Sequence, residues 1–374
     1  MRILFWSELF WPYGGGVEVL AAKVLPALSK RNYEFIVVTS HDYLDLPDEE
    51  EYKGIPVYRF PFREALSSGN FSKLISARQG VVKVKKRFAP DLVHASMIGP
   101  STLFHLQTLE AHPAPFLLTL QMEISPTNGS HLDTLQSKVV SAADWVTSCS
   151  ASALGQAIQL RKEIESHSSV IYNAVDVPDL IPKELPSDST KLLCIGRLVP
   201  QKGFDLALSA FAGLVDRFPA LRMIIAGDGS ERKNLEKQTV ELGLTNFVDF
   251  LGWILPEKVS SLINTATTVV MPSRHEGLPI VAIQAALMAR PVVGTRVGGL
   301  SEVVIDRHTG LLIEKENITA LRDALTYILE NPEHTRQMGQ AARLRAKEVF
   351  SFQQNVNAYD ELYRKLILKG FRNS

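Results

Sequence analysis

Two cationic side chains occur in a short segment that could bind phosphate. Arg197 and Lys202 follow the apolar run 192–195 and precede a helix-like stretch, with Gly196 between the run and the arginine. A guanidinium can donate two parallel hydrogen bonds to phosphate oxygens, and an ammonium adds a compact point charge. Such a pair could stabilise a departing diphosphate without a metal ion. The alternative is two solvated loop charges, the usual state of arginine and lysine.

A carboxylate lies just before a second expected helix start. Glu276 precedes Pro279, which we expect at the first helical position, and the run that follows is apolar except for Gln284. A carboxylate there can accept hydrogen bonds from sugar hydroxyls. A buried Gln284 needs a partner, and spacing alone leaves open whether this is a ribose hydroxyl or a backbone carbonyl.

Three consecutive glycines, Gly14, Gly15 and Gly16, stand between the first expected strand and a helix over about 17–29. Glycine permits close backbone approach and positive φ, and a helix N-terminus offers free N–H groups to an anion. The segment lacks the GxGxxG spacing. Phosphate binding and a simple strand-to-helix turn therefore both stay open.

The elements that must position these residues are short aliphatic runs alternating with helical stretches. Apolar residues at consecutive positions favour strands buried on both faces of a parallel sheet. The expected strands are 3–6, 35–39, 91–94, 116–120, 145–148 and 170–172, then 192–195, 223–226, 248–251, 268–271 and 291–295. The pattern predicts an α/β protein with two Rossmann-like, doubly wound domains. Because ligands bind outside the carboxyl ends of such strands, we expect the ligand-binding site in a cleft between the domains.

A proline-rich, charged segment separates the two sets of strands. We therefore expect an N-terminal domain over 1–178, a linker over 179–190 and a C-terminal domain over 191–352. Apolar residues near helical spacing then predict a C-terminal helix within 353–374, and packing against the N-terminal domain is the simplest way to bury them.

Composition limits the partners. The 374 residues carry 40 Lys plus Arg and 40 Asp plus Glu, so nothing in the total charge favours nucleic acid. The two cysteines belong to apolar runs, and no run reaches eighteen apolar residues, which predicts a soluble, cytoplasmic protein. A basic run at Lys83, Lys85, Lys86 and Arg87 reads as a solvated helix end, with anionic lipid at the inner membrane face as the alternative.

These motifs, in their order and separation, resemble glycosyltransferase family 4, whose members are retaining enzymes of the GT-B fold. Each motif is weak alone, but their joint order is specific, and the resemblance covers nearly the whole chain. The matching segments are the glycine loop at 14–16, Asn173–Asp176, Gly196–Leu198 with Lys202 and Gly203, Gly227–Gly229, Glu276–Pro279 and Gly298–Glu302.

The resemblance implies that the domain over 1–178 binds the acceptor and that the domain over 191–352 binds the nucleotide sugar. It also implies that Arg197 and Lys202 bind the donor diphosphate and that Glu276 contacts the donor sugar. Its further donor-binding positions are Gly15, Gly16, Gly196, Gly277, Leu278, Pro279 and Gln284. It implies no metal ion and no cofactor beyond the nucleotide sugar, with UDP the commonest donor nucleotide. The acceptor would be an alcohol on a saccharide, a lipid-linked saccharide or a small molecule, selected by N-domain loops at about 61–70 and 122–130.

Two positions depart from the family pattern. Gln284 stands where the second glutamate of the family's Glu-x7-Glu motif is expected, and Gln121 replaces a histidine. A neutral amide loses charge assistance toward ribose. A catalytically weak donor-binding or partner subunit is therefore the alternative to an active transferase, and a GT-B epimerase is a third, less favoured by the Glu276 loop.

Overall fold

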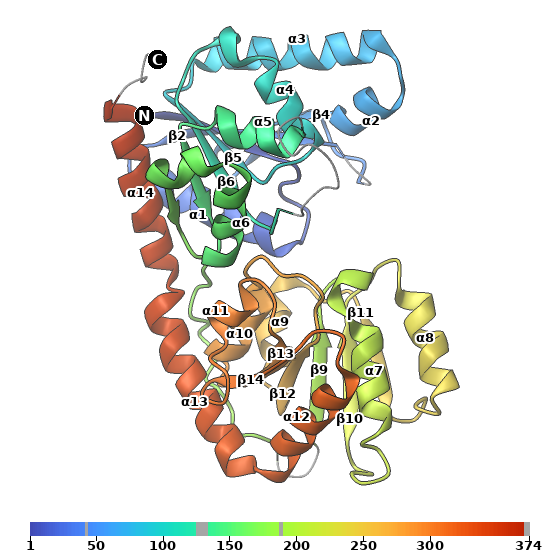
Figure 1. Cartoon of the computed structure of the whole chain (residues 1–374). Helices are drawn as coiled ribbons and strands as arrows, with labels where there is room; N and C mark the ends of the chain where they lie inside the picture. Colours follow the sequence, from blue (N-terminus) through green and yellow to red (C-terminus); the bar gives the residue numbers. More distant parts are fainter. Residues whose placement is uncertain (42–43, 125–133, 187–189, 370–374) are drawn as a thin grey trace. The chain divides into compact units, whose positions relative to one another are not determined.

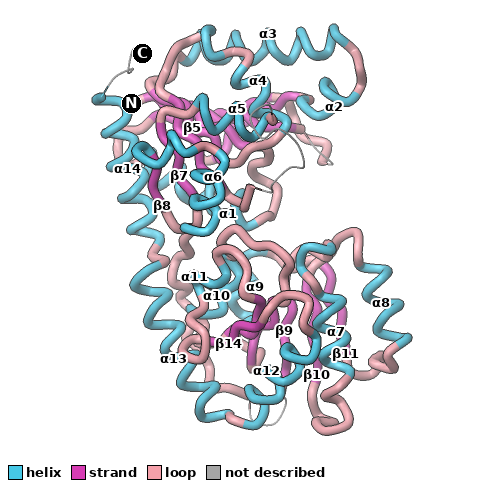
Figure 2. Tube along the Cα trace, viewed as in Figure 1, coloured by secondary structure: helices cyan, strands magenta, loops and turns pink. Residues whose placement is uncertain are grey.

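The computed structural model describes residues 1–41, 44–124, 134–186 and 190–369 (Figure 1). Two compact units make up the chain. The first comprises Met1–Tyr172 with Gln353–Ser374, and the second comprises Asn173–Phe352. In each unit, strands alternate with helices along the chain (Figure 2).

The first unit is built on an eight-stranded sheet in the order β3-β4-β2-β1-β5-β6-β7-β8. Neighbouring strands of this sheet pair in parallel, except that β3 runs antiparallel to β4. The strands are β1 Arg2–Ser7, β2 Glu34–Ser40, β3 Glu49–Tyr52, β4 Ile55–Phe60, β5 Leu92–Ser96, β6 Phe116–Leu120, β7 Trp145–Ser148 and β8 Ser168–Val170. Six of these correspond to expected runs, whereas β3 and β4 were not expected.

The helices of this unit cover the sheet with apolar side chains. They are α1 Gly16–Ser29, α2 Phe62–Ser67, α3 Phe71–Phe88, α4 Pro100–Leu106, α5 Leu135–Ala142, α6 Ala151–Leu160 and α14 Phe352–Lys369, with 3-10 turns η1 Leu109–Ala111 and η3 Lys162–His167. On α14, Tyr363 is buried, and its hydroxyl lies 2.6 Å from Nδ1 of His94 on β5. Nε2 of His94 lies 2.7 Å from Oγ1 of Thr119 on β6, so α14 is joined to the sheet through a buried polar chain.

The second unit holds a six-stranded, all-parallel sheet in the order β11-β10-β9-β12-β13-β14. Its strands are β9 Lys191–Ile195, β10 Arg222–Ala226, β11 Val248–Gly252, β12 Thr268–Met271, β13 Val292–Thr295 and β14 Gly310–Ile313. Its helices are η4 Pro200–Lys202, α7 Phe204–Ala212, α8 Arg232–Glu241, α9 Pro256–Ile263, α10 Ile280–Leu287, α11 Leu300–Val303, α12 Ile318–Glu330 and α13 Pro332–Val349. The two doubly wound sheets have the predicted α/β architecture.

The segment expected to link the domains is tied to the second unit. The amide nitrogen of Lys183 donates to Oδ1 of Asn264 at 2.9 Å, and the Asn264 side chain donates to the carbonyl of Ile181 at 3.0 Å. The buried Arg290 guanidinium also donates to the Lys183 carbonyl at 3.0 Å. Residues 187–189 of the expected linker lie outside the described residues.

Candidate active site

Glycines let three strand-end loops of the second unit touch one another through their backbones. Gly227 follows β10 with φ +137°, and a Cβ there would lie 1.9 Å from the carbonyl oxygen of Gly196 after β9. Gly203 has φ +65°, and a Cβ there would lie 2.1 Å from the carbonyl oxygen of Pro272 after β12. A side chain at either position would meet both backbone strain and a clash. The loop with Arg197 and Lys202 is thereby held against the loop that begins at Pro272.

An ion pair joins these two loops. Nζ of Lys202 lies 2.7 Å from Oε1 of Glu276, and the hydroxyl of Ser273 donates to the same oxygen at 2.7 Å. The lysine side chain is 19% exposed and the glutamate side chain only 5%. From sequence we expected separate ligands for the two residues and no role for Ser273. Their pairing neutralises a carboxylate that would otherwise be buried without a counter-charge.

The pairing leaves donors and acceptors for a ligand. An ammonium carries three N–H bonds, and Glu276 engages one of them. Both hydrogen bonds to Glu276 reach Oε1, and within the described ranges none reaches Oε2. Arg197 is exposed, and its guanidinium has no hydrogen bond or ion pair in the described part of the chain. Arg197 and Lys202 therefore both keep N–H groups that a phosphate could accept from without breaking the pair.

Backbone groups before α10 form a second part of the site. Gly277 and Leu278 are buried, yet their N–H groups find no partner among the residues that the structure describes. Unpaired N–H groups in a buried segment are costly unless a ligand or water accepts from them. Pro279, which we expected at the first helical position, is instead the N-cap of α10, because the helix begins at Ile280. This start can accept an anion or a sugar hydroxyl.

Three further predicted residues, Gln284, Gly15 and Gly16, are divided between the two units. Gln284 lies on α10, half-buried, and its amide makes no hydrogen bond within the described ranges, so the backbone-carbonyl alternative is not what the structure has. Gly15 is the N-cap of α1 and Gly16 its first residue, both in the first unit. Gly15 has φ −69°, so positive φ is not its role, and a Cβ there would meet only the flexible Glu18 carboxylate.

Gln121, where the resemblance led us to expect histidine, is buried in the first unit directly after β6. Its Nε2 donates to Oγ of Ser96 at 3.3 Å. Its Oε1 is buried and has no partner among the described residues. Part of the expected acceptor loop, residues 125–130, lies outside the described residues.

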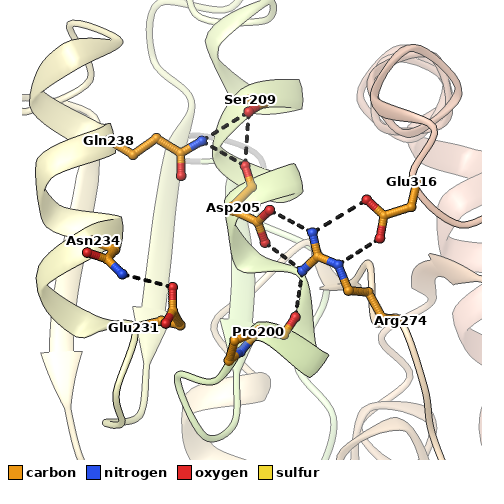
Figure 3. A network of polar contacts seen from close by, with 8 residues as sticks. All are labelled: Pro200, Asp205, Ser209, Glu231, Asn234, Gln238, Arg274 and Glu316. Carbon is orange, nitrogen blue, oxygen red and sulfur yellow. Dashed lines mark hydrogen bonds and ion pairs between the residues drawn. The ribbon is translucent and has the colours of Figure 1, made fainter.

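Arg274 connects the Glu276 loop to three other segments (Figure 3). Its guanidinium donates to both carboxylate oxygens of Asp205 on α7, at 3.0 and 2.8 Å, and Nε lies 2.7 Å from Oε1 of Glu316 before α12. Its backbone N–H donates to the carbonyl of Gln201 at 2.8 Å, and the side-chain amide of Gln201 donates to the carbonyl of His275 at 2.9 Å. These contacts therefore hold Arg274, the residue immediately before His275 and Glu276, from several directions.

The charges in this network reinforce one another. The hydrogen bonds that Arg274 donates to Asp205, and then those it donates to Glu316, raise the pKa of Arg274 despite partial burial. Burial alone would raise the pKa of Asp205, but the Arg274 hydrogen bonds and charge outweigh it and lower that pKa. Both groups are therefore held in their charged forms at neutral pH.

Replacing Arg274 with methionine is expected to lower kcat/KM by roughly tenfold to a hundredfold, because small misplacements of an active-site group cost this much. Since the ion pairs are partly exposed, we expect the free energy of unfolding to fall by only about 1 kcal/mol. Steady-state kinetics and chemical denaturation measure the two effects. The matched control is Arg336→Met, which removes an exposed pair with Glu333 on α13 and should change neither. Unchanged kcat/KM in the Arg274 variant would contradict a positioning role.

The described structure has no three His, Cys, Asp or Glu side chains grouped so that they could hold a metal ion. Among its described helices, none has the length and apolarity needed to cross a bilayer.

Two doubly wound units and a cation–carboxylate site at the carboxyl ends of parallel strands define a GT-B glycosyltransferase. Family models agree: residues 14–178 match Glycosyltransferase Family 4, and residues 178–345 match Glycosyl transferases group 1. The chain belongs to the glycosyltransferases that these two models describe, as the resemblance predicted.

Known proteins similar to this chain are also glycosyltransferases or share their fold. A glycosyltransferase of Methanocaldococcus jannaschii is 27% identical over 378 residues, which span 98% of this chain and 99% of that protein. Sucrose-phosphate synthase of Thermosynechococcus elongatus matches with a TM-score of 0.82 and 21% identity over 99% of this chain and 100% of that one. Anabaena HepE, solved with UDP-glucose, matches with a TM-score of 0.80 and 23% identity over 98% and 100%.

Proposed function

We propose that this glycosyltransferase moves a sugar from a nucleoside-diphosphate sugar, first of all a UDP-sugar, to a hydroxyl group in glycan or glycoconjugate synthesis, with retention at the anomeric carbon. The observation that carries the proposal is the Lys202–Glu276 pair beside the unpartnered N–H groups of Gly277 and Leu278. A cation, a carboxylate and free backbone donors within one site suit a ligand that carries both phosphate and hydroxyl groups.

In the proposed donor complex, Arg197 and Lys202 bind the diphosphate and stabilise the charge on the leaving nucleotide. Arg197 contributes a planar fork and Lys202 a point charge, and together they serve where other enzymes use a divalent ion. Glu276 accepts from sugar hydroxyls through Oε2. The backbone N–H groups of Gly277 and Leu278, next to Pro279, and the glycine at 196 border the sugar and the phosphates, and Gln284 binds the ribose through its neutral amide.

The proposed reaction is a front-face substitution. The bond between the anomeric carbon and the phosphate oxygen breaks, and the acceptor oxygen attacks from the same face. The acceptor proton passes to the departing phosphate oxygen. Such a reaction requires charge stabilisation and positioning more than a side-chain base, which fits a site whose charged groups are two cations and one carboxylate.

We assign the donor to the second unit and the acceptor to the first, and we propose that Gly15 and Gly16 at the helix start of α1 contribute backbone groups to donor binding. Support for UDP comes from HepE, whose structure was solved with UDP-glucose. Gln284 and Gln121 instead favour the second candidate, a donor-binding subunit with weak catalysis, because each replaces an ionisable family residue by a neutral amide.

A donor screen separates the two candidates. We expect a UDP-sugar to raise the unfolding temperature more than GDP- or ADP-sugars, since a ligand that binds only the folded state stabilises it. We also expect nucleotide release when alcohols are added. Stabilisation without release across a broad donor and acceptor panel would favour the donor-binding subunit.

Glu276→Gln tests the sugar contact. If Glu276 binds sugar hydroxyls, the variant should lose roughly tenfold or more in affinity for the UDP-sugar and much less for UDP, because a charge-assisted hydrogen bond is lost only with the sugar present. Isothermal titration calorimetry with each ligand measures the two affinities, and their ratio in the variant is compared with that in wild type. Loss of UDP binding to the same extent would show that Glu276 acts on the nucleotide side.

A further inference from the structure

One face of α3 in the first unit is exposed and carries large apolar side chains near its start. Phe71 is 79% exposed and Ile75 is 55% exposed, one helical turn later. Leu66, 36% exposed, lies on α2, which packs against α3. The opposite face of α3 is buried through Ala77, Val81 and other small or aliphatic residues. The exposed apolar residues therefore do not contribute to the core.

The same exposed face carries cations along the rest of the helix. Arg78, Lys83 and Lys86 are exposed and have no hydrogen bond or ion pair within the described residues. Of the other two exposed cations, Lys73 pairs with Glu64, and Arg87 is hydrogen-bonded to the hydroxyl of Tyr58. The helix itself contains no aspartate or glutamate.

Neighbouring elements do little to neutralise this charge. Helix α2, helix α4 and the turn η1 pack against α3, and β4 contacts it through Tyr58 and Arg87. Strand β4 has no acidic residue. Glu64 on α2 is already paired with Lys73, α4 has no acidic residue, and Glu110 is the one acid of η1. The positive charge is therefore local, because the whole chain has equal numbers of basic and acidic residues.

We propose that this surface, defined by Leu66, Phe71, Ile75, Arg78, Lys83 and Lys86, docks on a bilayer that contains anionic lipids. The cations match the phosphates of anionic headgroups, and Phe71 and Ile75 can enter the boundary between headgroups and acyl chains. A soluble polyanion would leave those two side chains without a partner. At 1.5 Å per residue, the 18 residues of α3 extend about 27 Å, which spans several lipid headgroups.

Docking of this kind needs both parts of the surface. Apolar area supplies part of the binding, and attraction to anionic lipid supplies the rest. Each cation near an anionic surface strengthens binding by roughly fivefold. Lys85, in the middle of the basic run, takes no part because its side chain is buried.

Co-sedimentation of the full chain with sucrose-loaded vesicles tests the proposal. We expect binding to phosphatidylcholine vesicles with 30% phosphatidylglycerol, weaker binding at 500 mM than at 100 mM NaCl, and little binding to phosphatidylcholine alone. Lys83→Gln/Lys86→Gln should weaken binding by roughly 20-fold or more, and Phe71→Ser/Ile75→Ser by at least about tenfold.

Matched controls lie on the second unit. Leu344→Ser on α13 removes a similarly exposed apolar side chain, and Lys233→Gln/Lys258→Gln removes two exposed cations from α8 and α9. None should change vesicle binding, and circular dichroism should show all variants folded. Wild-type protein that ignores phosphatidylglycerol vesicles, or whose binding survives both α3 variants, would overturn the proposal. So would retention on heparin without vesicle binding, which would identify a soluble polyanion instead.

Discussion

Arg197→Ala is expected to lower kcat/KM by roughly 10²–10³-fold, the usual cost of removing one preorganised donor to developing charge. The same change should leave the free energy of unfolding within about 0.5 kcal/mol of wild type, because Arg197 is exposed and unpaired in the described structure. Arg197→Lys should recover part of the loss, since it restores the charge but not the two-pronged geometry.

Steady-state kinetics with the best donor, together with chemical denaturation, measures both quantities. Lys233→Ala is the control, because it removes another exposed cation from the same unit. If Arg197→Ala lowered stability as much as activity, Arg197 would be structural. If it raised KM for the donor while kcat stayed constant, Arg197 would bind substrate and transition state equally well.

Lys85→Met is expected to change how stability depends on pH. Nζ of Lys85 lies 3.0 Å from the Thr108 carbonyl and 3.1 Å from Nδ1 of His105, and burial lowers its pKa to about 7. Burial, followed by the charge of Lys85, also lowers the pKa of His105 well below its usual value. The amine therefore has hydrogen-bond acceptors but no carboxylate.

The direction in which the free energy of unfolding changes with pH follows from the number of protons that each state binds. Below about pH 7, the lysine is protonated in both states, so its contribution is constant and unfavourable to folding. Between pH 7 and the usual pKa of 10.5, the unfolded chain keeps a proton that the folded chain has lost, so the free energy of unfolding rises with pH. Lys85→Met removes this rise. The methionine variant should be more stable than wild type at pH 7, and this advantage should shrink by about 2 kcal/mol by pH 9.

Urea denaturation at several pH values checks the difference. Other groups, such as the buried tyrosines, titrate in both proteins and largely cancel in the comparison. Lys83→Met is the matched control, two residues earlier on the same helix but exposed, and should give a difference that does not change with pH. A pH-independent difference for Lys85→Met as well would mean that the buried amine stays protonated throughout.

Much of the fold could be predicted because buried parallel strands have a simple sequence signature. Strands β6, β7 and β12 begin and end at the expected residues. Strand β3 has the sequence Glu-Glu-Glu-Tyr, and pairs with β4 at the edge of the sheet. An edge strand exposed to solvent needs no apolar run, so hydrophobic periodicity alone does not detect it.

The site could be predicted in part. The strand-end loops follow from the order of motifs, but Lys202 and Glu276 are 74 positions apart, and the sequence between them contains no signal for their direct contact. That contact depends on β9 and β12 being neighbours in the sheet, which is a topological fact. Lys85 is different: it lies four residues after Val81, on the buried face of α3, so helical periodicity could have separated it from Lys83 and Lys86. The expectation of one solvated basic run was wrong at Lys85.

The pairing of α14 with β5 and β6 affects how the molecule is made. The first unit is encoded in two stretches that flank the whole of the second. During synthesis, residues 173–352 can therefore complete their own core while the earlier sheet still lacks a covering helix. Until α14 leaves the ribosome, the imidazole of His94 has no tyrosine hydroxyl beside it. The segment translated first is thus the last to reach its native state, and a nascent chain stalled before α14 would be the species most exposed to chaperones and proteases.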